Sequence, residues 1–128
     1  MTLAAFGQLL ATGLAGAVGA LSRYALGRYI AQRVATAWPL GTLVINVTGA
    51  FAIGVLFALA EKQMMGTALQ SVLTTGFLGG YTTFSTMSWE GVELLRGGSG
   101  WLGLLYLAGS LLLGLTAAAG GLAVGRWL

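Results

Sequence analysis

The sequence predicts an all-α membrane protein with four transmembrane helices, and its composition carries that prediction. Of the 128 residues, 57% are hydrophobic and only 7% are charged, whereas a soluble domain is about 25% charged. The charges leave four uncharged runs, at 1–22, 34–60, 63–89 and 97–125. Each exceeds the roughly 20 residues that a helix needs to cross a bilayer, and in lipid the backbone must satisfy its own hydrogen bonds. We therefore expect a single four-helix transmembrane domain over residues 1–128.

The first two helices are expected over residues 3–30 and 40–60. The first carries Arg23 and Arg28 in its last third. Pro39 comes just before the second helix. Proline suits the first turn of a helix because the amide that it lacks would have no helical partner there. The chain therefore turns back after the first helix and enters the second at Pro39.

The third helix is expected over residues 67–95, with a break near its middle. Gly79 and Gly80 each weaken a helix by about 1 kcal/mol relative to alanine. Thr82 and Thr83 follow, and their side-chain oxygens suit helix caps. A broken helix frees carbonyl groups for a cation and amide groups for an anion, as in membrane transporters. A packing kink sealed by the threonine side chains explains the same pattern equally well.

The fourth helix is expected over residues 100–127. Like the other helices, it contains small residues spaced four apart, which let helix backbones approach closely. The pairs of this kind are Ala15 and Gly19, Ala50 and Gly54, Gly114 and Ala118, and Gly121 and Gly125.

An even number of helices places both termini on one side of the membrane. The basic residues divide weakly between the two sides, so the positive-inside rule gives little preference for one orientation. A weakly biased chain can insert either way, and two copies can then assemble antiparallel. Lys62 and Arg126 are expected on the side of the termini, and Arg28, Arg33 and Arg96, with Arg23 nearby, on the other.

Beyond the expected break, the third helix presents an apolar strip beside a strip of hydroxyl groups. Phe84 and Met87 are three residues apart and share a helical face, while Ser85 and Thr86 supply hydroxyls. Hydroxyls and the positive edges of phenyl rings attract an anion without a full charge. Such weak donors admit an ion without trapping it, as conduction requires. Hydroxyls bonded back to their own helix are the alternative interpretation.

Four other polar residues fall inside the expected helices. Asn46 lies about seven residues into the second helix and is either a site residue or a clamp between helices. Ser110 lies near the middle of the fourth helix, where a serine bonded to its own helix is the simpler interpretation. Glu90 lies roughly 15 Å past the break, which favours an ion pair or a vestibule role over a proton relay. Arg23 can snorkel to the interface.

Three motifs in order resemble the Fluc (CrcB-type) fluoride ion channel family. They are "LSRY" in the first helix, "GTLVIN" in the second and "GGYTTFST" in the third, and the resemblance extends over the whole chain. It implies an antiparallel, dual-topology homodimer with two fluoride pores. It also implies passive fluoride export across the prokaryotic plasma (inner) membrane, which provides fluoride resistance.

The resemblance also assigns roles to single residues. It implies a structural sodium ion at the dimer centre, bound by the backbone carbonyls of Gly79 and Thr82.

Met87 stands where the family has a second phenylalanine. We expect conduction to survive and its rate or anion discrimination to change, because a thioether lacks the ring's positive edge. At Gly114 a hydroxyl that would extend the polar track is missing. The remaining matches are Asn46 and Phe84 in the pore, Ser85, Thr86 and Ser110 along the polar track, and Arg23 and Glu90 in structural or vestibule roles.

Two other functions are compatible with four short helices. A proton-coupled small-multidrug-type exporter needs an acidic residue deep in a helix, and the first helix has none before Arg23. A structural subunit of a larger membrane complex would pass no ion. An enzyme is not expected, because the chain has no histidine and no cysteine and no carboxylate pair near mid-membrane. The expected partners are therefore fluoride, membrane lipid and a second copy of the chain, with no nucleic acid, because the net charge of +3 forms no basic stripe.

Overall fold

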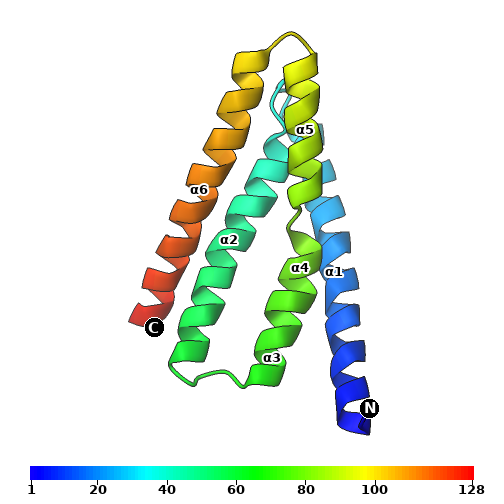
Figure 1. The fold of residues 1–128 in the computed structure, drawn as a ribbon, viewed down its shortest axis with the longest axis vertical. Coiled ribbons are helices and arrows are strands. Elements are labelled where there is room, and N and C mark those ends of the chain that lie inside the picture. Colours follow the sequence, from blue (N-terminus) through cyan, green and yellow to red (C-terminus); the bar gives the residue numbers. More distant parts are fainter.

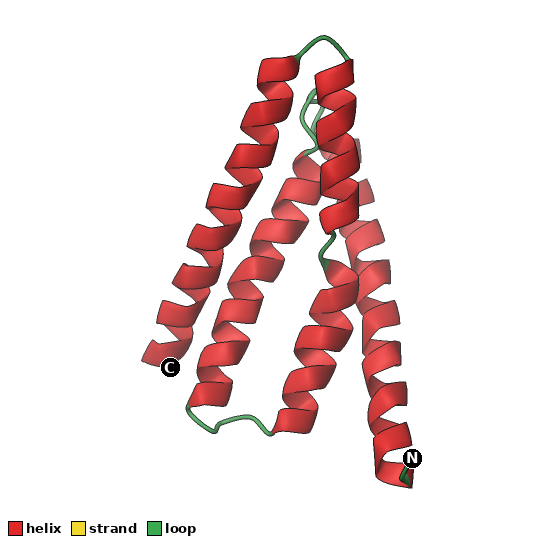
Figure 2. Ribbon diagram, viewed as in Figure 1, coloured by secondary structure: helices red, strands yellow, loops and turns green.

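The computed structural model describes residues 1–128 as four helical segments that alternate in direction (Figure 1). Both termini lie toward the same end, as an even number of segments requires (Figure 1). Helices joined by short loops make up the whole chain (Figure 2). Three segments are single helices, α1 (Leu3–Arg33), α2 (Leu40–Glu61) and α6 (Gly100–Trp127), and the remaining segment consists of α3 (Thr67–Ser71), the π-helix η1 (Val72–Leu78), α4 (Gly79–Tyr81) and α5 (Phe84–Arg96).

The observed helices agree closely with the expected ones. The ends of α2 and α6 fall within one residue of the expected boundaries, and α1 continues three residues further, to Arg33. These three helices are long and apolar enough to cross a membrane. The π-helix η1 was not predicted from the sequence.

Most side chains of this fold face outward. Only 15 of the 128 residues are buried, and large apolar residues such as Leu14, Leu112 and Leu115 are exposed along the helices. A soluble protein rarely exposes so large a contiguous apolar surface. The outer surface is therefore suited to lipid or to other transmembrane helices.

Close helix packing depends on glycines at the contact between α2 and α6, which lie side by side (Figure 1). A methyl group on Gly54 would overlap the carbonyl oxygen of Ala118, and one on Gly121 would overlap that of Phe51. The close approach predicted for these two glycines is confirmed. Gly114 has no such neighbour within 4 Å. The close helix packing predicted for this glycine therefore does not occur within one chain.

The predicted break in the third segment is present, but the glycine pair does not form it. Gly79 and Gly80 are helical within α4. A methyl group on Gly80 would overlap the carbonyl oxygen of Gly16, so this glycine lets α4 pack against α1. The helix stops instead at Thr82 and Thr83, whose backbones are extended. The break was expected from the glycines and the threonines together; the threonine part is confirmed at Thr83, which caps α5, and the glycine part is wrong, because both glycines stay helical.

The two threonines at the break have different roles. The Thr83 hydroxyl oxygen accepts a hydrogen bond from the amide of Thr86 at 3.2 Å and caps the N-terminus of α5. The Thr82 hydroxyl instead donates to the carbonyl of Leu78 at 2.9 Å, in the preceding turn. Thr83 alone therefore starts the second half of the segment.

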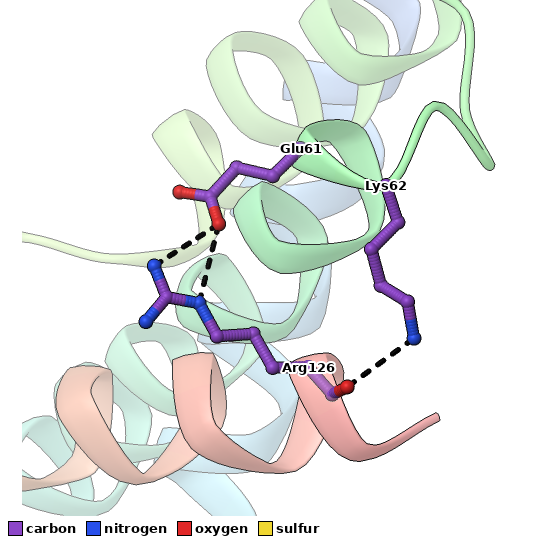
Figure 3. A network of polar contacts seen from close by, with 3 residues as sticks. All are labelled: Glu61, Lys62 and Arg126. Atoms are coloured by element: carbon purple, nitrogen blue, oxygen red, sulfur yellow. Dashed lines mark hydrogen bonds and ion pairs between the residues drawn. The ribbon is translucent and has the colours of Figure 1, made fainter.

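A small ionic cluster joins the ends of α2 and α6 (Figure 3). The Arg126 guanidinium donates to Glu61 Oε2 at 3.1 and 3.2 Å, and Lys62 Nζ donates to the Arg126 carbonyl at 3.2 Å. The side chains of the ion pair are more than half exposed, where such a pair contributes at most about 1 kcal/mol. The cluster aligns the two helix ends without being a main source of stability.

Candidate functional site

Two cavities meet at the break in the third segment. The larger, the α1 cavity, has a volume of about 700 Å³ and lies between α1, the connection that follows it, α2 and α5. The smaller, the break cavity, has a volume of about 370 Å³ and is lined by α2, η1, α4, α5 and the break itself. Thr83 lines both cavities. The break therefore lies between the two cavities, and Thr83 is the one residue that lines both.

The break cavity brings together five of the predicted site residues. Phe84 and Met87 line it from the first turn of α5, so the shared face expected from their spacing is confirmed. The Phe84 side chain is largely exposed, which leaves its ring edge accessible from outside the chain. Asn46, Gly79 and Thr82 complete this group from α2, α4 and the break.

Asn46 is bonded to the backbone of the break. Its Nδ2 donates to the Thr83 carbonyl at 2.9 Å, and its Oδ1 accepts from the Thr83 amide at 2.8 Å. These bonds satisfy two backbone groups that the interruption of the helix would otherwise leave unpaired. The clamp between helices, one of the two alternatives for Asn46, is thus formed. The second hydrogen on Nδ2 makes no hydrogen bond within the chain, so Asn46 retains one donor at the break cavity.

The break also leaves the carbonyl groups of residues 79–82 without their usual helical donors, those of Gly79 and Thr82 among them. In an unbroken helix the Gly79 carbonyl would accept from the amide of Thr83, and the Thr82 carbonyl from that of Thr86. The first amide instead donates to Asn46, and the second to the Thr83 hydroxyl. Gly79 and Thr82 both line the break cavity. Oxygen ligands of this kind suit a hard cation.

A cluster of hydroxyls surrounds Thr83. Its Oγ1 donates to Thr86 Oγ1 at 3.0 Å and lies 3.3 Å from Ser85 Oγ. Neither Ser85 nor Thr86 bonds back to a carbonyl of its own helix, whereas Ser88 does. The back-bonded alternative therefore does not hold for Ser85 and Thr86, and their hydroxyls remain available to other groups.

Glu90 is bonded to two hydroxyls and makes no ion pair. Thr42 Oγ1 donates to one carboxylate oxygen and the Tyr106 hydroxyl to the other, each at 2.8 Å. The predicted ion pair forms at Glu93 instead, which contacts Arg96 at 3.3 Å. Glu90 lines the α1 cavity together with Arg23, so the vestibule position is compatible with the fold and the ion-pair expectation for Glu90 is wrong. Two hydroxyl donors, and no basic side chain, therefore bind its carboxylate.

Ser110 is buried in α6 with an unpaired hydroxyl. Its Oγ has no hydrogen-bond partner in the chain, so the expectation of a serine bonded to its own helix is wrong. Buried polar atoms almost always have a partner. Ser110 lies one helical turn beyond Tyr106, whose side chain is fully buried. Its hydroxyl is a free donor close to the hydroxyl groups that bind Glu90.

Three residues of the site were not predicted from the sequence. Thr42 lies four residues before Asn46, and Tyr106 four residues before Ser110, so each shares a helical face with a residue that was identified. That spacing was a usable signal. Thr83 was considered only as a cap, and its position between two cavities depends on the path of the broken backbone, which spacing does not reveal.

Comparison with known proteins places this arrangement in a family. The model of the family described as "CrcB-like protein, Camphor Resistance (CrcB)" matches residues 10–122. The chain belongs to the CrcB-like family. A similar protein from Chloroflexus aurantiacus, named fluoride-specific ion channel FluC, is 43% identical to this CrcB-like chain over 94% of the chain and 96% of the relative. Another relative, fluoride-specific ion channel FluC 1 of Brucella melitensis, is 47% identical over 83% of the chain and 89% of its own length.

This CrcB-like chain is an all-α, multi-pass membrane protein. Three of its helices have the length and apolarity of membrane spans, and the broken third segment packs against α1 in the same bundle (Figure 1). Its polar groups meet at the break and along the inner faces of α2 and α6. The arrangement offers weak hydrogen-bond donors and free carbonyls, and no histidine or cysteine is present.

Proposed function

We propose that the chain is a fluoride-selective channel through which fluoride leaves the cell passively, down its electrochemical gradient, so that cytoplasmic fluoride falls. The observation that carries this proposal is the high identity, over nearly the whole chain, to proteins named as fluoride-specific channels. The transport function involves no chemical transformation, so the protein is not an enzyme. Its role is to offer fluoride a path that other anions do not share.

The weak donors around the break support an anion path. Phe84 lines the break cavity with its ring, and Asn46 keeps one free amide hydrogen there. Ser85 and Thr86 continue the path on α5, and the unpaired hydroxyl of Ser110 continues it on α6. None of these groups carries a full positive charge, so they replace part of the hydration of fluoride without trapping the ion.

We propose that the carbonyls of Gly79 and Thr82 bind a structural sodium ion. Two free carbonyls at one break fit a monovalent hard cation in ligand type, but two ligands are too few for a complete shell. A second copy of the chain related by two-fold symmetry would supply two more. When bound, sodium provides a positive charge that holds the breaks of the two copies together.

We further propose that the chain forms an antiparallel, dual-topology homodimer in the prokaryotic plasma membrane, whose second copy would supply the additional sodium ligands. The chain exposes large apolar side chains on most of its surface, so both lipid and a second copy have apolar surface to contact. Arg28, Arg33 and Arg96 oppose Lys62 and Arg126, and this weak bias permits both orientations. Residues 1–128 would then act as one transmembrane domain of the dimer.

Ion release from liposomes tests the channel function. Purified protein is reconstituted into vesicles loaded with potassium fluoride, valinomycin is added, and release is followed with a fluoride electrode. Vesicles loaded with potassium chloride and followed with a chloride electrode serve as the control. We expect fast fluoride release and no chloride release.

A variant at Met87 extends this test. Met87→Phe restores an aromatic edge beside Phe84. We expect the wild-type protein to conduct fluoride and the variant to conduct it with a different rate or selectivity. No release of either anion from a folded wild-type protein would contradict the channel proposal. If fluoride release then appeared with Met87→Phe, the loss would be traced to the thioether alone.

A further inference from the structure

The wall of the α1 cavity contains a second arginine besides Arg23. Arg23 and Arg28 both line it, together with Tyr24 and Gly27 from the same stretch of α1. Their spacing corresponds to one face of a helix. Arg33, five residues further along, does not line the cavity. Two of the three arginines of α1 therefore line the same space.

The Arg28 guanidinium is held at the cavity and makes no ion pair. Its Nη1 donates to the Tyr24 hydroxyl at 3.1 Å, which fixes the side chain along α1. The two salt bridges of the chain involve other residues. Arg33 has a different environment, since its guanidinium lies over the Tyr29 ring at 4.8 Å from the ring centre. The charge of Arg28 is thus available to an ion that enters the cavity.

The charge of the cavity wall is positive. Glu90 is its only acidic residue, against the guanidinium groups of Arg23 and Arg28. The Glu90 carboxylate is bonded to Thr42 and Tyr106. Arg28 lies roughly 7.5 Å further along the helix axis than Arg23, toward the end of α1. An ion coming from the solution at this end therefore meets Arg28 before it reaches Arg23.

We propose that Arg28 is an electrostatic steering residue that draws fluoride into the α1 cavity before the ion reaches the break. The proposal rests on the proposed channel function and adds the residue that controls the rate of entry at this mouth. The net positive charge of the cavity wall raises the local concentration of an anion, because the low-dielectric walls of a cleft focus the field. Salt screens that attraction over about 10 Å at 0.1 M ionic strength.

Single-channel recording in planar bilayers tests Arg28 directly. Currents are measured in symmetrical 30 mM sodium fluoride, with and without N-methyl-D-glucamine gluconate at about 0.5 M, so that ionic strength rises while sodium and fluoride stay constant. Arg28→Gln removes the charge and Arg28→Lys keeps it. Arg33→Gln is the matched control, because it removes one charge from the same helix outside the cavity wall.

We expect Arg28→Gln to lower the fluoride current about twofold at low ionic strength, as one unit charge at about 10 Å in water predicts. The difference should disappear at high ionic strength. Arg28→Lys and Arg33→Gln should both conduct like the wild type. A deficit that persists in high salt, an equal deficit in Arg33→Gln, or a wild-type current in Arg28→Gln at low salt would overturn the steering role. A wild-type protein without fluoride current would instead overturn the channel function, and the steering role with it.

Discussion

Asn46 illustrates how one residue supports both the fold and the proposed path. Both polar atoms of its amide bond the backbone of Thr83. We expect Asn46→Asp to destabilise the protein by about 1–3 kcal/mol, because the carboxylate places an acceptor against the Thr83 carbonyl and leaves that group unpaired. Thermal unfolding in detergent, followed by circular dichroism, measures the change.

Thr116→Val is a suitable control for Asn46. The Thr116 hydroxyl is exposed and bonds only the Leu112 carbonyl of its own helix, so its removal should change the unfolding free energy by less than about 0.5 kcal/mol. If Asn46 acted only as a ligand of the ion, Asn46→Asp would unfold at the wild-type temperature. That result would contradict the role of Asn46 as a clamp that stabilises the break.

A substitution at Ser110 should affect fluoride transport without lowering the stability of the protein. Its buried hydroxyl has no partner, so we expect Ser110→Ala to leave the unfolding free energy unchanged or to raise it by up to about 1 kcal/mol. Fluoride efflux from liposomes should nevertheless fall, because the path loses a free donor. Ser22→Ala, which removes a hydroxyl bonded to the Val18 carbonyl, should leave efflux unchanged. Destabilisation of Ser110→Ala without any loss of efflux would show that the serine serves packing alone.

At the residue scale, the sequence predicted which side chains matter better than what they contact. Asn46 was identified as a polar residue deep in an apolar helix, and Phe84 and Met87 by their spacing and by the family resemblance. The structure brings all three together at the break cavity. The bonds of Glu90 were missed because they come from α2 and α6. Contacts between distant segments depend on helix rotation and tilt, which periodicity within one segment does not specify.

At the scale of the elements, the third segment shows that contacts between helices can outweigh the low helix propensity of single residues. Low helix propensity predicted a break at the glycine pair, yet Gly80 stays helical because the backbone of α1 lies against it. The break falls at Thr82 and Thr83, where the Thr83 cap and the bonds to Asn46 satisfy the freed backbone. Tertiary contact therefore outweighed an intrinsic cost of about 1 kcal/mol per glycine. The break and a threonine cap at it were predictable, whereas the helical state of the glycine pair was not, because it depends on the contact with α1.

The contact between α2 and α6 can be tested with two glycines of the same helix. A methyl group on Gly121 would overlap the Phe51 carbonyl oxygen, whereas one on Gly114 would meet no such neighbour. We expect Gly121→Ala to lower the unfolding free energy by about 1–3 kcal/mol through overpacking. Gly114→Ala should raise it by up to about 1 kcal/mol, through helix propensity alone. Thermal unfolding of both variants gives the comparison. Equal stability of the two would contradict the close packing of the helices.

At the scale of the whole molecule, the composition predicted the architecture with few errors. The uncharged runs correspond to four segments, and the even count correctly places both termini at one end (Figure 1). This success has a physical basis, because a membrane leaves helices as nearly the only way to satisfy a single chain's backbone. The same surface is apolar on nearly every side, and a pattern that is uniform around the helices cannot indicate where a second copy binds.

The absence of cysteine makes the proposed dual topology directly testable. Single cysteines are introduced at Gln63, in the loop between α2 and α3, and at Ser99, in the loop between α5 and α6. These loops lie at opposite ends of the bundle (Figure 1). Because the basic residues are nearly balanced between the ends, we expect an impermeant maleimide to label each position in about half of the molecules in intact spheroplasts. Labelling after permeabilisation gives the total accessible to the reagent.

Changing the balance of basic residues between the two ends provides a control for the dual-topology experiment. Adding lysines beside Lys62 should shift the population so that Gln63→Cys is protected in intact spheroplasts and Ser99→Cys is labelled, because positive loops stay in the cytoplasm. If dual topology is required for assembly, this biased chain alone should lose fluoride efflux. Co-expression with a chain biased the opposite way, by lysines beside Arg96, should restore it. Labelling of only one loop in the unmodified chain, together with full efflux, would contradict the antiparallel assembly.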